Sequence, residues 1–240
     1  MSAKSNSRCI VALDVNSLEE AKQIVDELGD SVSFYKVGMQ FYYSQGNEVL
    51  RYLQSKNKSI FLDLKLHDIP NTVAKSAAAL SKLGVSLMTL HSLGGFAMMQ
   101  AAAQAVKESA AAENREVPKL LAVTILTSMD EAALKQVGCP LAIGEEVLTL
   151  AKLAKAAGMD GVVASPHEAA MIRKACGDDF LIVTPGIRPA GAALQDQSRA
   201  STPAAALAAG ATHLVIGRPI TQAADKNLAV EKILAEMETV

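Results

Sequence analysis

The sequence has few aromatic residues and no excess of either charge. Aromatic residues make up 4% of the 240 positions, whereas 50% are hydrophobic. The interior must therefore be built mainly from Ala, Val, Leu and Ile, which is typical of a sheet covered by helices on both faces. Lys and Arg number 23 against 25 Asp and Glu, a formal charge of -2. This balance excludes a general field for nucleic acid or an acidic membrane, so any anion must be bound by a few local groups.

Cysteines and long apolar runs are also scarce. The three cysteines, at positions 9, 139 and 176, are odd in number and far apart, which argues against a disulfide framework or a zinc site and favours a reducing cytoplasm. No run approaches the ~18 apolar residues that cross a bilayer. The N-terminal MSAKSNSR has no apolar region behind its charges. We expect a cytoplasmic protein that contacts neither membrane nor nucleic acid.

Short β-branched runs alternate with longer amphipathic segments along the whole chain. Strands are predicted at 9–14, 33–37, 59–64, 86–90, 120–125, 161–164, 180–184 and 213–216. Helices are predicted at 17–28, 44–56, 71–83, 95–113, 144–157, 167–175, 203–209 and 219–238. Glycines stand where several of these helices should end, namely Gly29, Gly84, Gly158, Gly177 and Gly210.

Eight strand–helix units in about 240 residues predict an α/β protein with a closed (β/α)8 barrel. The alternative, an open Rossmann-like sheet, would carry GxGxxG after the first strand, where the sequence reads ALDVNS. No linker interrupts the series, so we predict that residues 1–240 form a single catalytic domain. The long connection at 185–202 has the length of a loop that is either disordered or functional, and an active-site lid is one such function.

Polar residues recur at the carboxyl ends of the predicted strands, where barrels carry their catalytic groups. The residues in question are Asp14, Lys36, Asp63, Lys65, His91, Thr127, Arg188, Gly217 and Arg218. Any one of them is read most simply as part of a structural ion pair or a solvated loop. As a set they favour function, because three consecutive strands direct charges at one rim and buried ion pairs are poor stabilisers.

The third strand carries the densest group of charges, within IFLDLKLHDIPNT at 60–72. The side-chain period of two places Asp63 and Lys65 on one face of this strand, with Leu62 and Leu64 on the other, toward the helices. The same argument lets Asp14 and Lys36 project inward from the neighbouring strands. We therefore predict a cluster of cations and carboxylates at the barrel mouth.

Two loops near the end of the chain carry features of a phosphate site. VIGRPI at 215–220 runs from a strand through Gly217 and Arg218 to a proline that suits the first turn of a helix. TPGIR at 184–188 adds Arg188 at the adjoining rim. Phosphate groups in barrels commonly lie at the loops after strands seven and eight. Either arginine alone is explained equally well as a surface residue. Two arginines in neighbouring loops favour anion binding.

Other chemistries find little support in the sequence. The four histidines lack the HExxH spacing, and no metal site is predicted. GxSxG, a Walker loop and a lysine context suited to pyridoxal phosphate are all missing, so neither nucleophilic catalysis nor a cofactor is expected. We interpret His91 as a residue of the core or the rim that forms hydrogen bonds.

With these residues in place, the chain resembles the bacterial type of the orotidine 5′-phosphate decarboxylase family. The likeness runs from VALDV through DLKLHDIPNT, LTS at 126–128, TPGIRP and DQ at 196–197 to IGRPIT. A DxKxxD pattern alone is shared by a wider group of barrels. It becomes specific together with Lys36 and the two arginine loops.

The resemblance implies a cofactor-independent lyase that converts orotidine 5′-monophosphate to UMP in pyrimidine biosynthesis. It implies that Asp63, Lys65 and Asp68, joined by Lys36, form the catalytic array, with Lys65 protonating C6. The implied substrate contacts are Asp14 and Lys36 at the ribose, Asp63 in the charged array, Thr127 and Gln197 at the base or lid, and Arg188, Gly217 and Arg218 at the phosphate. It also implies a homodimer in which Asp68 and Thr72 enter the neighbouring site.

Two alternatives stay open at this stage. A 3-keto-hexulose-phosphate-type decarboxylase or aldolase shares DxKxxD but uses Mg²⁺ and an acidic residue where this chain has Lys36, and a lysine would repel the metal. A non-catalytic sensor of phosphorylated ligands could use the same scaffold. The intact Asp63, Lys65 and Asp68 argue against a sensor.

Overall fold

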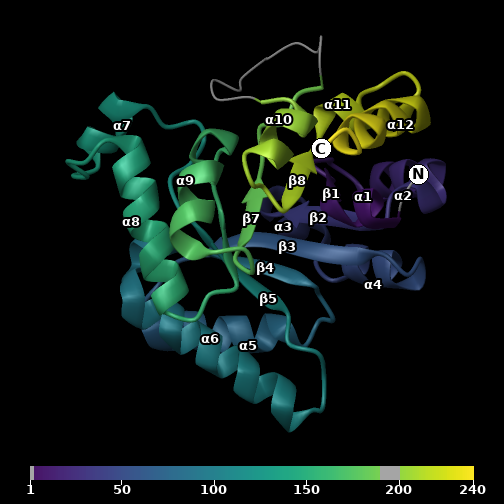
Figure 1. Cartoon of the computed structure of the whole chain (residues 1–240). Coiled ribbons are helices and arrows are strands. Elements are labelled where there is room, and N and C mark those ends of the chain that lie inside the picture. The colour runs from purple at the N-terminus through teal and green to yellow at the C-terminus, as the bar shows by residue number, and fades with distance from the viewer. Residues whose placement is uncertain (1–2, 190–200) are drawn as a thin grey trace.

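Eight parallel strands close into one barrel in the computed structural model, which describes residues 3–189 and 201–240. Each strand pairs with the next in the chain, and β1 closes the ring by pairing with β8. The helices lie outside the strands (Figure 1). The prediction of a (β/α)8 barrel is confirmed, and the open-sheet alternative is wrong because the first and last strands are hydrogen-bonded to each other.

The strands lie where the β-branched runs predict them. They are β1 Cys9–Ala12, β2 Phe34–Gly38, β3 Ser59–Leu66, β4 Leu87–His91, β5 Lys119–Val123, β6 Gly161–Val163, β7 Leu181–Thr184 and β8 His213–Ile216. The predicted ranges differ from these by two residues or fewer at each end. Apolar β-branched runs bounded by turn residues are therefore sufficient to find every strand of this barrel.

The helices follow the prediction less closely. They are α1 Ala3–Arg8, α2 Leu18–Leu28, α3 Met39–Gln45, α4 Glu48–Ser55, α5 Pro70–Ser81, α6 Gly95–Ala112, α7 Glu131–Gln136, α8 Ile143–Ala156, α9 Pro166–Cys176, α10 Pro203–Ala208, α11 Arg218–Thr221 and α12 Lys226–Met237, with short 3-10 turns η1 Gly29–Ser31 and η2 Ser92–Gly94. The short α1 and α7 were not predicted. The five glycines expected at helix ends all have positive φ, which confirms that expectation.

Two predicted helices are each divided in the structure. The segment predicted at 44–56 contains only the end of α3 and then α4, because Gly46 takes φ 58 and donates its N–H to the Tyr42 carbonyl, which ends α3; residues 39–43 of α3 were not predicted as helix. The segment predicted at 219–238 is α11 followed by α12, because the Asp225 side chain accepts a hydrogen bond from the Leu228 N–H and starts a new helix. Capping hydrogen bonds thus end or start a helix even where the apolar pattern of the sequence continues through the break.

The apolar core has two layers, one on each side of the strands. Inside the barrel, one cluster is formed by Ile10, Ala12, Phe34, Phe61, Leu87, Leu121, Val183 and Val215. Between the strands and the helices lies a larger cluster, which includes Leu62 and Leu64 as predicted. The interior cluster fills the barrel beneath the carboxyl rim and leaves the polar strand ends above it. Along the described residues no helix is both long and apolar enough to cross a membrane.

Candidate active site

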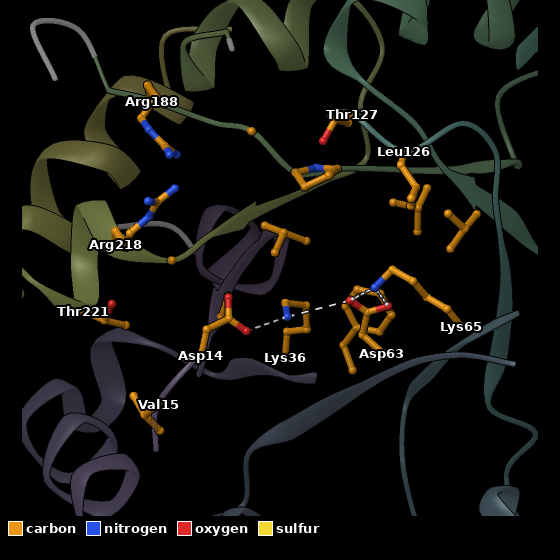
Figure 2. A pocket seen from close by; sticks show the side chains of 18 of the residues that line it. Asp14, Val15, Lys36, Asp63, Lys65, Leu126, Thr127, Arg188, Arg218 and Thr221 are labelled. Atoms are coloured by element: carbon orange, nitrogen blue, oxygen red, sulfur yellow. Dashed lines mark hydrogen bonds and ion pairs between the residues drawn. The ribbon is translucent and has the colours of Figure 1, made fainter. Parts of the chain in front are cut away.

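Four charged side chains of alternating sign form a row across the strands β1 to β3 at the carboxyl rim (Figure 2). Lys36 Nζ lies 3.0 Å from Asp14 Oδ1 and 3.7 Å from Asp63 Oδ2. Lys65 Nζ donates to both oxygens of Asp63 at 2.9 Å. The predicted convergence of Asp14, Lys36, Asp63 and Lys65 is therefore present in the structure.

Burial differs along the charged row. The side chains of Lys36 and Asp63 are each 12% exposed, whereas that of Asp14 is 64% exposed. Asp63 is therefore a largely buried carboxylate that contacts two ammonium groups, and Asp14 lies at the solvent end. Burying such charges costs free energy that their mutual attraction offsets only in good geometry. The two short contacts from Lys65 to Asp63 provide that geometry.

The backbone at Lys65 departs from the regular strand that the period of two assumes. Lys65 has φ 51, and the pairing of β3 with β4 shifts register between Leu62 and Leu66. The expected meeting of Asp63 and Lys65 still occurs, but through a bulge rather than simple alternation. Bulges in barrels redirect side chains next to functional sites.

Thr89 of β4 supports this bulge and was missed by the sequence analysis. Its hydroxyl accepts a hydrogen bond from the Lys65 backbone N–H at 2.9 Å and donates one to Asp63 Oδ1 at 2.9 Å. The only signal in the sequence is a polar residue at an inward position of the apolar run LMTL. Threonine is common in strands, so this signal is weak.

A cavity of about 500 Å³ opens above the barrel interior and is lined by most of the predicted residues. Those that line it are Asp14, Lys36, Asp63, Lys65, Thr127, Arg188, Gly217 and Arg218. Apolar side chains that the sequence analysis did not single out form much of the remaining wall, including Phe61, Val123, Val163 and Val215. Glu20, Thr221 and Gln222 also line it and were missed, although the last two lie close to Arg218 in the chain.

The two predicted arginines lie in the same part of the cavity. Figure 2 shows the guanidinium groups of Arg188 and Arg218 pointing toward one another, on the opposite side of the pocket from Lys65. Arg188 follows β7 through Gly186, whose φ of 78 suits glycine. Arg218 begins α11 directly after β8. The cavity thus has a cationic end separate from the row of alternating charges.

Two predicted residues do not line this cavity, and a third is not among the residues that the structure describes. Asp68 and Thr72 are exposed at the start of α5, and neither lines the cavity. The Asp68 carboxylate accepts a hydrogen bond from the Ile69 N–H at 2.7 Å. Gln197 lies outside the described residues, as does most of the predicted loop at 185–202. A single chain therefore does not bring Asp68 to Lys65.

His91 lies at the end of β4 and stacks on His67, with ring centroids 5.5 Å apart. Burial, followed by the nearby His67 and Lys65, lowers the pKa of His91, so the neutral ring is favoured. Its Nδ1 is buried without a hydrogen-bond partner in the described part of the chain. Among the described residues no group of three or more His, Cys, Asp or Glu side chains is arranged to hold a metal ion.

Comparison with known proteins points to one family. Residues 7–233 match the family model described as "Orotidine 5'-phosphate decarboxylase / HUMPS family". The orotidine 5′-phosphate decarboxylase of Moorella thermoacetica is 50% identical over 237 residues, covering 98% of this chain and 94% of that protein. That of Trichlorobacter lovleyi is 50% identical over 234 residues, covering 98% and 96%. The crystal structure of the Lactobacillus acidophilus enzyme superposes with a TM-score of 0.85 at 45% identity, covering 95% of this chain and 98% of that one.

Proposed function

This chain belongs to the orotidine 5′-phosphate decarboxylase / HUMPS family, and we propose that it converts orotidine 5′-monophosphate to UMP in pyrimidine biosynthesis. The reaction is that of a carboxy-lyase, and we propose that it needs no cofactor. The observation that carries the proposal is a single cavity with an Asp/Lys row at one side and two arginines at the other. Such a cavity suits a ligand with a phosphate at one end and a reacting ring at the other.

Lys65 is the proposed proton donor. Loss of CO₂ leaves the electron pair of the broken bond on C6, in the plane of the pyrimidine ring, where the π-system delocalises it poorly. Fixed positive charge must then stabilise the carbanion. Asp63 contacts the Lys65 ammonium at 2.9 Å and holds it at the cavity wall. The ammonium transfers a proton to C6 to give UMP and regains one from solvent afterwards.

One charge pair does not account for the whole rate enhancement. Two unit charges ~4 Å apart contribute roughly 4 kcal/mol at an effective dielectric of about 20. Enzymes typically lower the barrier by ~8–23 kcal/mol. In this proposal the remainder comes from binding the distant phosphate, because binding energy at a non-reacting group can organise the charged site. Arg188, Gly217 and Arg218 bind that phosphate, and Gln197 contacts the lid or base.

The sugar and the base occupy the middle of the cavity in this proposal. Asp14 and Lys36 hold the ribose, since both lie between the arginines and Lys65 in Figure 2. Thr127 contacts the pyrimidine from across the cavity. The apolar wall around Phe61 and Val123 faces the planar ring, where it excludes water from the reacting carbon.

We propose a homodimer in which Asp68 and Thr72 complete the site of the neighbouring subunit. Both residues are exposed at the rim, where α5 and α6 begin. Apolar side chains are exposed there too: Ile69 is 66% exposed, Leu93 43% and Phe96 39%. These exposed apolar side chains accompany Asp68, whose carboxylate does not line the cavity of its own subunit. Such an arrangement suits contact with a second copy of the chain.

A continuous assay tests the proposed function. Purified protein is mixed with orotidine 5′-monophosphate in the presence of EDTA, and conversion to UMP is followed by ultraviolet absorbance. We expect turnover that EDTA does not change, because the Lys36 ammonium lies between the carboxylates of Asp14 and Asp63, where a divalent cation would be repelled. No turnover, or turnover that requires Mg²⁺, would contradict the proposal.

A further inference from the structure

We propose that Thr89 is a positioning residue that fixes both partners of the Lys65–Asp63 pair, and this inference rests on the proposed decarboxylation. Thr89 lies on the inner face of β4 and is 1% exposed. It does not line the cavity, so it has no predicted contact with substrate. It acts through the two residues it contacts.

The Thr89 hydroxyl closes a ring of hydrogen bonds. The Lys65 N–H donates to Thr89 Oγ1, Thr89 Oγ1 donates to Asp63 Oδ1, and Lys65 Nζ donates to the same Asp63 oxygen, each at 2.9 Å. A hydroxyl has one proton to give and lone pairs to accept with. The Thr89 hydroxyl gives its proton to the Asp63 carboxylate and therefore accepts from the Lys65 backbone N–H. One side chain thus fixes both Asp63 and Lys65.

The bulge of β3 makes this hydroxyl necessary. The register shift between Leu62 and Leu66 takes the Lys65 N–H out of the regular ladder, and φ 51 is an unfavourable conformation for a lysine. Thr89 supplies the hydrogen bond that the ladder no longer provides. Without it, a part-buried N–H and a buried carboxylate oxygen each lose a partner. Lys65 would then relax toward a regular strand and carry its ammonium away from the cavity.

Substitutions at Thr89 separate the hydroxyl from the shape of the side chain. Thr89→Val keeps the shape and removes the hydroxyl, whereas Thr89→Ser keeps the hydroxyl. Misplacing a reacting group by ~1 Å can cost about a hundredfold in rate. We expect Thr89→Val to lower kcat by about tenfold to a hundredfold, with UMP affinity unchanged because the phosphate end of the cavity is untouched. Thr89→Ser should recover most of the loss.

Thr124→Val is the matched control. Thr124 is also fully buried next to the cavity wall, and its hydroxyl donates at 2.9 Å, but to the Val163 backbone carbonyl rather than to a charged side chain. Its kcat should stay near that of the parent. If Thr89→Ser is as slow as Thr89→Val, the methyl group matters rather than the hydroxyl, and the inference is overturned. Parental kcat in Thr89→Val overturns it as well.

Further measurements keep the test decisive. If Thr89→Val is insoluble, Thr89→Ser and Thr89→Ala still differ from one another by the hydroxyl alone, and equal kcat values in these two would contradict the inference. Failure of the proposed function is distinguishable, because the unsubstituted protein would then show no decarboxylation. An active parent with an unaffected Thr89→Val variant leaves the function intact and removes only the role of Thr89.

Discussion

Lys65 combines an unusual backbone with the charge on which the proposed chemistry depends. Three described residues other than glycine have positive φ, and the other two are the asparagines Asn57 and Asn114. Asparagine tolerates the left-handed region, whereas a lysine there costs free energy, on the order of 1–3 kcal/mol. Strain of this kind persists where the surroundings fix it. At Lys65 those surroundings are Thr89 and Asp63.

Replacing Lys65 by alanine should nearly abolish turnover. General acid catalysis contributes about 10²–10⁴-fold and a preorganised charge about 10²–10³-fold, so we expect a loss of at least about 10⁴-fold in kcat. UMP binding should stay measurable, because the arginines are unchanged. The comparison is Lys119→Ala, which removes an exposed lysine paired with Asp160 at the amino end of β5. Turnover near that of the parent would remove Lys65 from its role.

Arg218→Ala should reduce affinity for phosphate rather than for the nucleoside. A hydrogen bond to a charged group contributes about 1.5–3 kcal/mol, so the dissociation constant for UMP should rise by about tenfold to a hundredfold. Uridine, which lacks the phosphate, should bind the variant as it binds the parent. Calorimetry with both ligands measures the two affinities, and the exposed Arg51 provides a control as Arg51→Ala. Unchanged UMP affinity would place the phosphate elsewhere.

Sequence reasoning found the site residues whose position follows from a local rule. Asp14, Lys36 and Asp63 lie at strand ends, so the parallel order of the strands brings them together. Thr89 escaped notice because its partners depend on a bulge in a neighbouring strand, which no local pattern indicates. Asp68 belongs to the charged stretch that the sequence shows, but its role was predicted only through family resemblance, and its partner lies outside its own chain in the proposed dimer.

At the level of the elements, strands were easier to predict than helices for a physical reason. A barrel strand is a short apolar run with polar ends, and each of its signals is local. A helix is predicted by a period of 3.6 residues that continues through a break. Gly46 and Asp225 therefore divide helices that the period predicted as continuous. Weak amphipathic segments such as α1 and α7 carry too few turns for the period to be read.

The ladder between β6 and β7 has no room for a side chain at Gly161. A Cβ added there would lie 2.3 Å from the Leu181 carbonyl oxygen and 2.5 Å from its Cβ, and backbone cannot move aside cheaply. We expect Gly161→Ala to lower the free energy of unfolding by about 1–3 kcal/mol, measured by urea denaturation. Gly144→Ala is the control, since its Cβ would meet only the flexible Met171 end at 3.4 Å. Equal stability in the two variants would contradict this view of the ladder.

For the whole molecule, a partly buried histidine should make stability depend on pH. His213 begins β8, with its ring edge-on to Phe34 and its Nδ1 3.0 Å from Thr212 Oγ1. Burial, with a smaller effect from Arg8, lowers the pKa of His213 to about 4, whereas an unfolded histidine titrates near 6.5. The neutral ring therefore stabilises the fold above pH ~6.5, and this contribution is lost as the pH falls toward ~4.

The expected loss from His213 is on the order of 3 kcal/mol between these two pH values. Urea denaturation of the parent and of His213→Gln across this range measures it, and the variant should show the shallower dependence. His91, whose pKa is also lowered by burial, keeps part of the slope in the variant. Identical slopes in both proteins would contradict the assignment. The predicted single domain of residues 1–240 adds the expectation of one cooperative transition.

Mixing two inactive variants tests the shared site of the proposed homodimer. In a heterodimer of Lys65→Ala and Asp68→Ala chains, one site carries both changes and the other carries neither. Random reassociation of equal amounts should therefore restore about a quarter of the parental activity. Lys65→Ala mixed with Asp63→Ala is the control, because both residues belong to the catalytic array of the same site and no intact site can form. Failure of the first mixture to recover activity would argue against exchange of Asp68 between subunits.

A crystal structure with UMP bound is the most direct test of the central claim, that an ammonium group held by Asp63 delivers the proton to the ring. We predict Lys65 Nζ within hydrogen-bond reach of C6, about 3 Å away, and the phosphate between Arg188 and Arg218. A Lys65 side chain directed away from C6, or a phosphate bound at the Lys65 end of the cavity, would contradict it.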